Sequence, residues 1–304
     1  MKATTRLRQL LASGNTLVAP GAHDAMTAMV LEKVGFDLIY MTGYGTAAAM
    51  GMPDVGLTTI GEMIRNAQYM ANAVSIPIIA DSDTGGGNAV NVVRTIREYI
   101  QAGVAGIHME DQVTPKRSGH WAGKRLIPLE EAVGKIRAAV DTRDRLDPDF
   151  VVVARTDARG AVGGGVDEAI RRGNAYADAG ADLVFFESPF SEEEVERAAR
   201  EIRTKLMILP GGLSPYIPLE RMNRMGIGIT ILAALSFRAV GKAMYDAGVL
   251  IREQGIDGYR RLIESTKGHP MDDFNAFINK DLADIEARYL PTELTASFKQ
   301  GPSA

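Results

Sequence analysis

The sequence predicts an α/β protein in which eight strands and helices alternate and close into a (β/α)8 TIM barrel. Eight short runs of strand-forming apolar residues are separated by segments with helical periodicity, and several runs end directly at an acidic residue. Strand–helix alternation is typical of parallel βαβ units, and eight such units in roughly 240 residues match a barrel. An open, doubly wound sheet is the alternative, because periodicity alone does not establish closure.

The expected strands are apolar runs without polar alternation, as strands covered on both faces require. They lie at residues 16–20, 37–42, 77–82, 106–110, 150–156, 183–187, 206–210 and 227–232. Between them we expect helices, for example at residues 59–74, 89–102, 129–142, 167–179, 192–203 and 217–225. Asn88 is the expected N-cap of the helix that begins at residue 89. Gly103 stands at the end of that helix, where glycine adopts the left-handed conformation at low cost.

The C-terminal part of the chain predicts more helix than a barrel needs. Residues 234–296 have a helical pattern with a break near residues 268–270. We therefore expect this extension to pack on a neighbouring subunit. No linker divides the chain, so residues 1–304 are expected to form one barrel domain with C-terminal helices from about residue 234.

Composition narrows the class of protein. The 304 residues include 46% hydrophobic and 24% charged residues, carry a formal charge of −4 and contain no cysteine. This composition predicts neither a nucleic-acid surface nor a polybasic membrane patch, and it excludes disulfides and thiolate chemistry. No apolar run approaches the roughly 20 residues of a membrane span, and residues 1–11 lack the apolar core of a secretory signal. We expect a cytoplasmic enzyme with no nucleic-acid or membrane partner.

Acidic residues at the strand ends are the main candidates for chemistry. Asp81 with Asp83, Glu110, Asp157 and Glu187 stand where four apolar runs end, and in a parallel barrel all strand ends meet at one mouth. Because Asp81 and Asp83 are two residues apart, they can share one face and reach one cation. Such hard oxygen ligands suit Mg²⁺. The alternative is a strand-end turn whose acids only cap a helix.

Arg155 and a long loop complete the candidate site. A buried Arg155 needs an anionic partner, either Glu110, Glu187 or a substrate carboxylate, although an ion pair that only ties strands together is equally consistent. The loop at residues 111–128 contains His120 in a dense polar set and can close over the barrel mouth. The alternative for this loop is a solvated basic segment. The glycines at residues 85–87 match no phosphate-binding motif, which argues against a nucleotide cofactor.

Seven short motifs occur in an order that is specific in combination. They are Val18-Ala19-Pro20-Gly21-Ala22-His23-Asp24-Ala25, Tyr40-Met41-Thr42-Gly43-Tyr44, Gly51-Met52-Pro53-Asp54, Ala80-Asp81-Ser82-Asp83-Thr84-Gly85, His108-Met109-Glu110-Asp111-Gln112, Pro115-Lys116-Arg117-Ser118-Gly119-His120 and Ala154-Arg155-Thr156-Asp157-Ala158. On these motifs the chain resembles the isocitrate lyase/phosphoenolpyruvate mutase superfamily, from Leu7 to about Tyr289.

The resemblance implies a helix-swapped barrel in a homotetramer, a dimer of dimers, that binds Mg²⁺ and a small 2-oxo or 2-hydroxy acid. Mn²⁺ is the alternative metal. By position, Asp83 is the implied direct metal ligand, Asp81 and Glu110 act through waters, and Asp54 lies nearby. The implied substrate contacts are Tyr40, Thr42, Gly43, Tyr44, Asp81, Gly119, His120, Arg155 and Glu187. The implied catalytic residues are Tyr40, Lys116, Ser118, His120 and Arg155, and the gating loop carries Lys116, Ser118, Gly119 and His120.

Two departures from the lyase pattern bear on the substrate. Ser118 stands where the lyases carry the cysteine that donates a proton, and a serine hydroxyl is a much weaker acid. Residues 207–212 lack the Asn and Glu of the lyases, which suggests a less polar distal group on the substrate.

The function that the resemblance implies is a Mg²⁺-dependent carbon–carbon lyase. It would cleave a methylisocitrate-like or dimethylmalate-like 2-hydroxy acid to a 2-oxo acid such as pyruvate plus a carboxylic acid, with Tyr40 handling the hydroxyl proton. The alternatives are oxaloacetate decarboxylation, carbon–phosphorus chemistry on phosphonopyruvate, and a non-catalytic ligand-binding paralogue.

Overall fold

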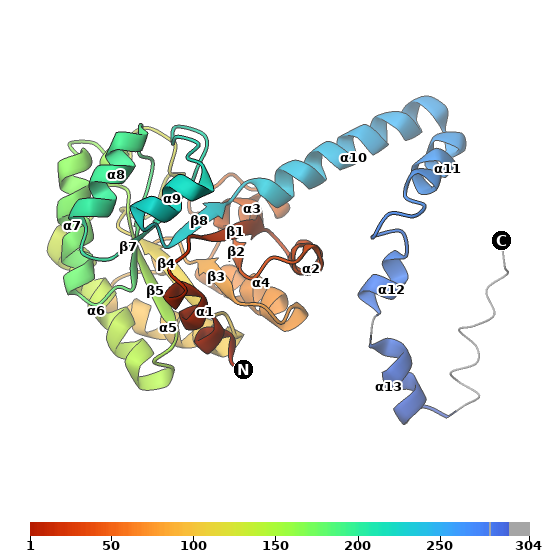
Figure 1. Ribbon diagram of the computed structural model, residues 1–304, viewed down its shortest axis with the longest axis horizontal. Coiled ribbons are helices and arrows are strands. Elements are labelled where there is room, and N and C mark those ends of the chain that lie inside the picture. Colours follow the sequence, from red (N-terminus) through yellow and green to blue (C-terminus); the bar gives the residue numbers. More distant parts are fainter. Residues whose placement is uncertain (280, 292–304) are drawn as a thin grey trace. The chain divides into compact units, whose positions relative to one another are not determined.

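Eight parallel strands close into a barrel in chain order, with β8 paired to β1. The computed structural model describes residues 1–279 and 281–291. The described residues fall into two compact units, one up to Val240 and the other from Gly241 on. The predicted (β/α)8 barrel is confirmed, and the open doubly wound sheet is wrong because the strand order has no edge (Figure 1).

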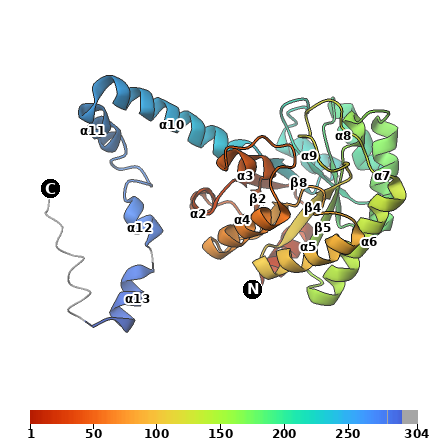
Figure 2. The same ribbon diagram turned by 180° about the vertical axis from the view of Figure 1, so that it is seen from behind.

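All eight predicted strands are present within a few residues of their expected positions. They are β1 Leu17–Ala22, β2 Ile39–Met41, β3 Ile78–Asp81, β4 Gly106–Glu110, β5 Val151–Thr156, β6 Leu183–Phe186, β7 Lys205–Ile208 and β8 Ile229–Leu232. Helices of the first unit surround these strands in both ribbon views (Figures 1 and 2).

The six helices that were named from the sequence are also present, and three others precede them. The helices of the first unit are α1 Ala3–Ala12, α2 Ala25–Val34, α3 Gly43–Ala49, α4 Ile60–Ala73, α5 Ala89–Ala102, α6 Leu129–Leu146, α7 Val166–Asp178, α8 Glu192–Glu201 and α9 Leu219–Met225, with a short 3-10 turn η1 at Ala158–Gly160. Asn88 is the N-cap of α5 as predicted, because its side chain accepts a hydrogen bond from the Val90 amide at 3.0 Å.

The expected C-terminal helices occur as α10 Leu235–Gln254, α11 Ile256–Ser265, α12 Phe274–Ile278 and α13 Leu282–Tyr289. The predicted break near residues 268–270 falls between α11 and α12. The last part of the predicted helical extension, residues 292–296, lies outside the described residues. A single domain over residues 1–304 and an exchange of helices between subunits both stay predictions.

The barrel unit has two apolar layers, and strand alternation assigns residues to one or the other. Inward-facing side chains such as Val153 and Phe185 fill the barrel, whereas neighbours such as Val152 pack against the surrounding helices. The next inward position along β5 after Val153 is Arg155, and the next after Phe185 is Glu187. Polar residues at the strand ends therefore continue the inward-facing rows into the mouth.

Helix α1 helps close the opposite end of the barrel. Leu7 is fully buried in the interior cluster. Arg8 forms an ion pair with Asp182 at 2.6 Å and donates a hydrogen bond to the Phe150 carbonyl at 3.0 Å. These contacts tie the start of the chain to β5 and β6, so the functional end is the carboxyl edge of the strands.

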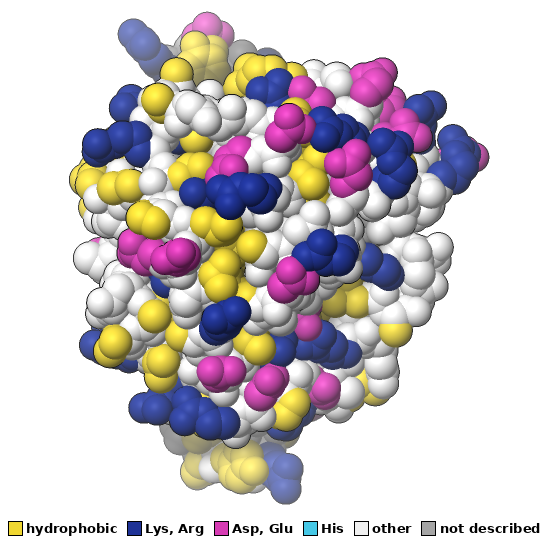
Figure 3. Space-filling view, turned by 90° about the vertical axis from the view of Figure 1, so that its left-hand side faces the viewer, with side chains coloured by type: hydrophobic (Ala, Val, Ile, Leu, Met, Phe, Trp, Pro, Cys, Tyr) yellow, Lys and Arg dark blue, Asp and Glu magenta, His cyan; other side chains and the backbone are white. Residues whose placement is uncertain are grey.

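The outer face of the barrel unit carries charges of both signs. Figure 3 shows Lys and Arg side chains interspersed with Asp and Glu. Surface ion pairs of this kind include Arg171 with Glu168 and Arg197 with Glu201. None of the described helices has both the length and the apolar composition that a bilayer crossing requires.

A glycine in β4 provides a test of the barrel packing. A Cβ at Gly106 would lie 2.6 Å from the Val151 carbonyl oxygen, on the strand with which it pairs. We expect Gly106→Ala to lower the free energy of unfolding by about 1–3 kcal/mol, since a backbone atom must move. The matched control is Gly134→Ala on α6, where a Cβ meets nothing within 4 Å. There we expect a gain of about 0.5–1 kcal/mol. Urea unfolding measures both, and equal midpoints for the two variants would contradict the packing argument.

Candidate active site

Strand register places oppositely charged residues side by side at the mouth. Glu110 ends β4 and pairs in register with Arg155 on β5, while Asp81 ends β3 and Glu187 follows β6. Asp81 is 5%, Glu110 2%, Arg155 8% and Glu187 2% exposed. Four charged side chains that are so deeply buried need counter-charges, and two basic residues organise them.

The first group of acids surrounds Lys116, which comes from the long loop. The buried Lys116 ammonium forms an ion pair with Asp54 and lies 2.9 Å from Asp83 Oδ1. Asp83 has a φ of 46°, an uncommon conformation for a residue with a side chain, and its amide donates to Asp81 Oδ1 at 2.9 Å. Burial raises the pKa of Asp81 and of Asp83, and Lys116 opposes both shifts. Burial also opposes the charge on Lys116, but the surrounding carboxylates outweigh it and raise the pKa of the ammonium.

The second group of acids surrounds Arg155. Its Nε and Nη2 atoms donate to the two oxygens of Asp157 at 2.9 and 3.1 Å. Glu110 Oε2 lies 3.3 Å from Nε, and Glu187 Oε2 lies 3.8 Å from Nη2. Burial raises the pKa of Glu110 well above its usual range, although Arg155 opposes this. For Asp157 burial acts in the same direction, but Arg155 and Lys124 outweigh it and lower the pKa.

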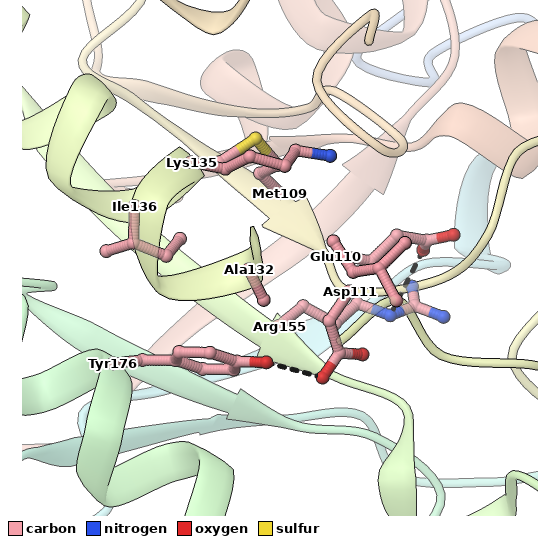
Figure 4. A pocket seen from close by; sticks show the side chains of 9 residues that line it. Met109, Glu110, Asp111, Ala132, Lys135, Ile136, Arg155 and Tyr176 are labelled. Atoms are coloured by element: carbon pink, nitrogen blue, oxygen red, sulfur yellow. Dashed lines mark hydrogen bonds and ion pairs between the residues drawn. The ribbon is translucent and has the colours of Figure 1, made fainter. Parts of the chain in front are cut away.

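A small cavity lies behind this group, between the ends of β4 and β5 and the helices α6 and α7. Figure 4 shows Glu110 and Arg155 at one side of it and the hydrogen bond of 2.7 Å from Tyr176 to Asp111 at another. Its volume of about 10 Å³ is room for roughly one water molecule. It is therefore too small to be a substrate site.

Tyr40 and His108 form a buried hydrogen-bonded pair inside the barrel. The Tyr40 hydroxyl lies 2.8 Å from His108 Nε2 and 3.3 Å from Asp81 Oδ2. Burial, with a contribution from Arg155, lowers the pKa of His108 to about 3, so its ring is neutral near pH 7. Burial and Asp81 raise the pKa of Tyr40 well above its usual value. We assign the tautomer with the proton on Nε2, because His108 then donates to Tyr40 and Tyr40 donates to Asp81.

The loop of residues 111–128 is folded over the mouth. Its stem is an antiparallel bridge between Gln112 and Leu126. Near its tip, the Gly119 carbonyl accepts a hydrogen bond from Ser188 at 2.9 Å, and His120 Nε2 lies 3.6 Å from Glu187 Oε1. The loop thus carries its basic residues onto the strand-end acids, and the alternative of a solvated basic loop is not what the structure shows.

The remaining predicted site residues differ in how close they lie to the acids. The Gly43 amide donates to Asp81 Oδ2 at 3.2 Å. Thr42 is buried and caps α3 by accepting a hydrogen bond from the Gly45 amide at 3.2 Å. Ser118 is half-buried near the loop tip, where its carbonyl accepts a hydrogen bond from the Trp121 amide at 2.9 Å. Tyr44 is 45% exposed and packs on the Phe237 ring at 4.8 Å.

The carboxylates at the mouth supply the oxygen ligands and the negative charge that a divalent cation requires. Six buried or nearly buried carboxylates meet three cationic side chains at the mouth, so three carboxylates have no formal counter-charge. The acids are Asp54, Asp81, Asp83, Glu110, Asp157 and Glu187, and the bases are Lys116, Lys124 and Arg155. Neither oxygen of Glu110 accepts a hydrogen bond from any described residue. A buried carboxylate that accepts no hydrogen bond is costly, and the ion pair with Arg155 at 3.3 Å offsets this cost only in part.

The expected ligand set is nevertheless not assembled around one point. Across residues 1–279 and 281–291, no three His, Asp or Glu side chains are grouped closely enough to hold a metal ion. The Lys116 ammonium lies between Asp54 and Asp83, and Glu110 faces Arg155 instead. Metal binding by Asp54, Asp81, Asp83 and Glu110 therefore stays a prediction.

Sequence reasoning did not single out two residues that shape this site, Lys124 and Ser188, and it did not give Asp157 its role beside Arg155. Asp157 holds Arg155, Ser188 holds Gly119, and Lys124 contacts both Asp157 and Gly119. Asp157 is marked by the sequence as a strand-end acid, and its place two residues beyond Arg155 could have indicated the pairing. Lys124 gave no signal, since a lysine in a basic loop looks like a solvated residue.

Comparison with known proteins gives a consistent set of relatives. A model of the family described as phosphoenolpyruvate phosphomutase matches residues 7–251. The chain is 50% identical over 249 residues to a 2,3-dimethylmalate lyase from Eubacterium barkeri, covering 81% of this chain and 85% of that protein. It is 40% identical over 251 residues to a 2-methylisocitrate lyase from Aeropyrum pernix, covering 82% of this chain and 80% of that protein.

Solved structures agree with the sequence comparisons. A crystal structure of 2,3-dimethylmalate lyase matches with a TM-score of 0.88 and 35% identity, covering 100% of this chain and 99% of that chain. A phosphonopyruvate hydrolase in complex with oxalate and Mg²⁺ matches with a TM-score of 0.84 and 32% identity, covering 96% of this chain and 100% of that chain.

The lowered pKa of His108 predicts an unusual titration. The unfolded chain takes up a proton near pH 6.5, whereas the folded site takes it up only near pH 3, so His108 makes the fold less stable as the pH falls below about 6.5. We expect the ring nitrogen signals of His108 in NMR spectra to stay those of a neutral imidazole from pH 8 to pH 5. The control is the urea-unfolded protein, whose histidines titrate near pH 6.5. A His108 ring that gains its proton in the folded protein above pH 5 would contradict the assignment.

Proposed function

The chain belongs to the phosphoenolpyruvate phosphomutase family, and from this premise we propose that it is a carbon–carbon lyase. The proposed substrate is an alkyl-substituted 2-hydroxy dicarboxylic acid of the dimethylmalate type, and the products are a 2-oxo acid such as pyruvate and a carboxylic acid. The observation that carries the proposal is the closed loop, which holds Lys116 and His120 against buried strand-end carboxylates. The identity of 50% to a 2,3-dimethylmalate lyase supports the same reaction class.

The proposed cofactor is Mg²⁺, with Mn²⁺ as the alternative. Asp83, Asp81 and Glu110 would hold it, with Asp54 nearby, because they form the acid-rich side of the mouth. When bound, the metal would supply positive charge that stabilises negative charge on the product oxygens. The Mg²⁺ in the related phosphonopyruvate hydrolase structure supports this choice.

The protein's own residues supply substrate binding and proton movement. Arg155 is the proposed partner of a substrate carboxylate, because a guanidinium binds a carboxylate through two parallel hydrogen bonds. Tyr40 stays a protonated phenol, so we assign it the role of a relay that passes the substrate hydroxyl proton to Asp81, 3.3 Å away. The bond between the hydroxyl-bearing carbon and its neighbour then breaks, and the neighbouring carbon needs a proton.

The gating loop is the proposed source of that proton. His120 is the better candidate of the two loop residues, because the hydroxyl of Ser118 is a weak acid and His120 Nε2 lies beside Glu187 at 3.6 Å. Gly119 fits here because a Cβ would collide with Glu187 and Arg155. Closure of the loop also excludes water while the carbon is protonated.

An apolar wall supports a dicarboxylate over a tricarboxylate substrate. Met207 is fully buried in the barrel interior, and Leu209 and Ala233 pack at the edge of the same cluster. These residues continue the inward-facing rows of β7 and β8. The ends of these two strands are therefore apolar, whereas the ends of β3 to β6 are charged. A methyl group fits such a wall, whereas a third carboxylate would be left without a partner.

Oxaloacetate decarboxylation is the second candidate. Ser118 favours it, because the enolate that forms on loss of carbon dioxide can take its proton from water and needs no strong acid on the loop. The apolar wall at Leu209 argues against it, since oxaloacetate has no alkyl group to place there.

A substrate panel tests the proposed function. With Mg²⁺ present we expect dimethylmalate to yield pyruvate fastest, ahead of methylisocitrate, oxaloacetate and phosphonopyruvate, and chelation by EDTA to stop the reaction. Asp83→Asn should lower kcat by about 10²-fold or more, because a charged ligand is lost. The control is Asp167→Asn, a surface change at a side chain that is 86% exposed and pairs with Arg197. Undiminished turnover in Asp83→Asn, or turnover of oxaloacetate alone, would contradict the proposal.

We also propose a homotetramer in which the C-terminal helices pack on a neighbouring subunit. Large apolar side chains stand exposed along the described part of these helices: Met244, Tyr245, Val249, Ile256, Tyr259, Ile263, Phe274, Ile278, Leu282, Ile285, Tyr289 and Leu290. Such a density of exposed apolar surface predicts a protein interface.

Light scattering after size-exclusion chromatography tests the assembly. We expect a molar mass four times the 32.7 kDa of one chain. Replacing Tyr245 and Ile256, which are 73% and 83% exposed, by Asp should shift the mass toward that of smaller species. A wild-type mass of one chain at micromolar concentration would contradict the proposal.

A further inference from the structure

Lys124 is a buried lysine that the proposed reaction does not use. Only 1% of its surface is exposed. Its backbone is fixed near the C-terminal end of the gating loop, where its carbonyl accepts a hydrogen bond from the Val162 amide at 3.0 Å. The next residue, Arg125, accepts one from the Val113 amide at 2.8 Å. The stem is thus anchored, while the Lys124 side chain extends from it toward the loop tip.

The Lys124 ammonium joins the loop tip to the barrel. It donates to the Gly119 carbonyl at 2.5 Å and to Asp157 Oδ1 at 2.8 Å. The same carbonyl accepts a second hydrogen bond from Ser188 at 2.9 Å. Two side chains from separate segments therefore hold one backbone oxygen of the loop, and this marks a defined docking point.

Asp157 shares its carboxylate between this docking point and Arg155. Oδ1 accepts from Lys124 and also from Arg155 Nη2 at 3.1 Å, and Oδ2 accepts from Arg155 Nε at 2.9 Å. Asp157 itself is fully buried, and its amide donates to Asp111 Oδ1 at 3.0 Å. Because one rigidly held carboxylate bonds both cations, removal of one cation changes the hydrogen bonds that the carboxylate makes with the other.

We propose that Lys124 is a positioning residue that couples the docking of the loop tip to the orientation of Arg155. The inference rests on the proposed function, in which Arg155 binds a substrate carboxylate beneath the loop. When the tip is docked, Lys124 divides its hydrogen bonds between Gly119 and Asp157. When the tip leaves, the ammonium loses the Gly119 carbonyl and keeps Asp157, so its hydrogen bonding to the carboxylate that orients Arg155 changes. Loop closure and carboxylate binding therefore favour each other.

Three variants and two ligand-based measurements test the proposal. Lys124→Met removes both contacts, Lys124→Arg keeps the positive charge, and Ser188→Ala removes only the other donor to Gly119. An arginine-specific protease reports tip docking through the cleavage rate after Arg117, which is exposed beside the buried Lys116. Calorimetric titration with oxalate and Mg²⁺ reports carboxylate binding.

In Lys124→Met we expect cleavage after Arg117 to be at least about tenfold faster and oxalate affinity to fall by a similar factor, as expected for loss of a charged hydrogen bond. Ser188→Ala should speed cleavage but change oxalate affinity by less than the Lys124 variant does. Lys124→Arg should recover part of both properties, which a purely structural role would not predict. A melting temperature for each variant identifies any loss of fold, and if Lys124→Met does not fold, Lys124→Gln replaces it.

The outcomes separate this inference from the proposed function. Unchanged cleavage in Lys124→Met would overturn the docking role. Faster cleavage with wild-type oxalate affinity would overturn the coupling. Failure of the wild type to bind oxalate would contradict the proposed function and the coupling together. A wild type that binds oxalate but turns over none of the panel substrates would contradict the lyase assignment alone.

Discussion

The site depends on one constraint: a closed barrel directs the inward-facing rows of all eight strands into a single buried mouth. The closed strand order and the alternation of side chains leave no other direction for Asp81, Glu110, Arg155 and Glu187. More carboxylates than cations collect there, and the desolvation of those carboxylates raises the pKa of Asp81, Asp83 and Glu110. The mouth therefore attracts positive charge.

The gating loop responds to that excess of negative charge. It places the ammonium of Lys116 beside Asp54 and Asp83. Closing the loop thus neutralises carboxylates that would otherwise be buried without partners, which makes the closed state favourable in electrostatic terms. The same excess accounts for how one site can suit both a lysine-bearing loop and a divalent cation, because each supplies the charge that the acids lack.

The sequence predicted the parts of the structure that local pattern controls. The eight strands, the Asn88 cap and the convergence of Glu110 with Arg155 follow from apolar runs, capping chemistry and the parallel register. The pairing of Lys116 with Asp54 joins residues 62 positions apart, and it depends on the path of a loop that has no periodicity. Tyr44 shares a motif with Tyr40, yet it belongs to α3 and packs on Phe237 because a helix and a strand turn successive side chains differently. Long-range side-chain partners of loop residues are therefore the part that the sequence could not supply.

The contacts of Arg155 differ in strength in a way that suits exchange with a substrate. Asp157 accepts two hydrogen bonds at 2.9 and 3.1 Å, whereas Glu110 and Glu187 lie at 3.3 and 3.8 Å. A guanidinium is planar, so the tight pair with Asp157 sets its orientation, and the same Nε and Nη2 atoms also face the looser acids. In the proposed function, a substrate carboxylate would displace these looser contacts. Lys124 also donates to Asp157 and therefore acts on the pair that sets the orientation of Arg155.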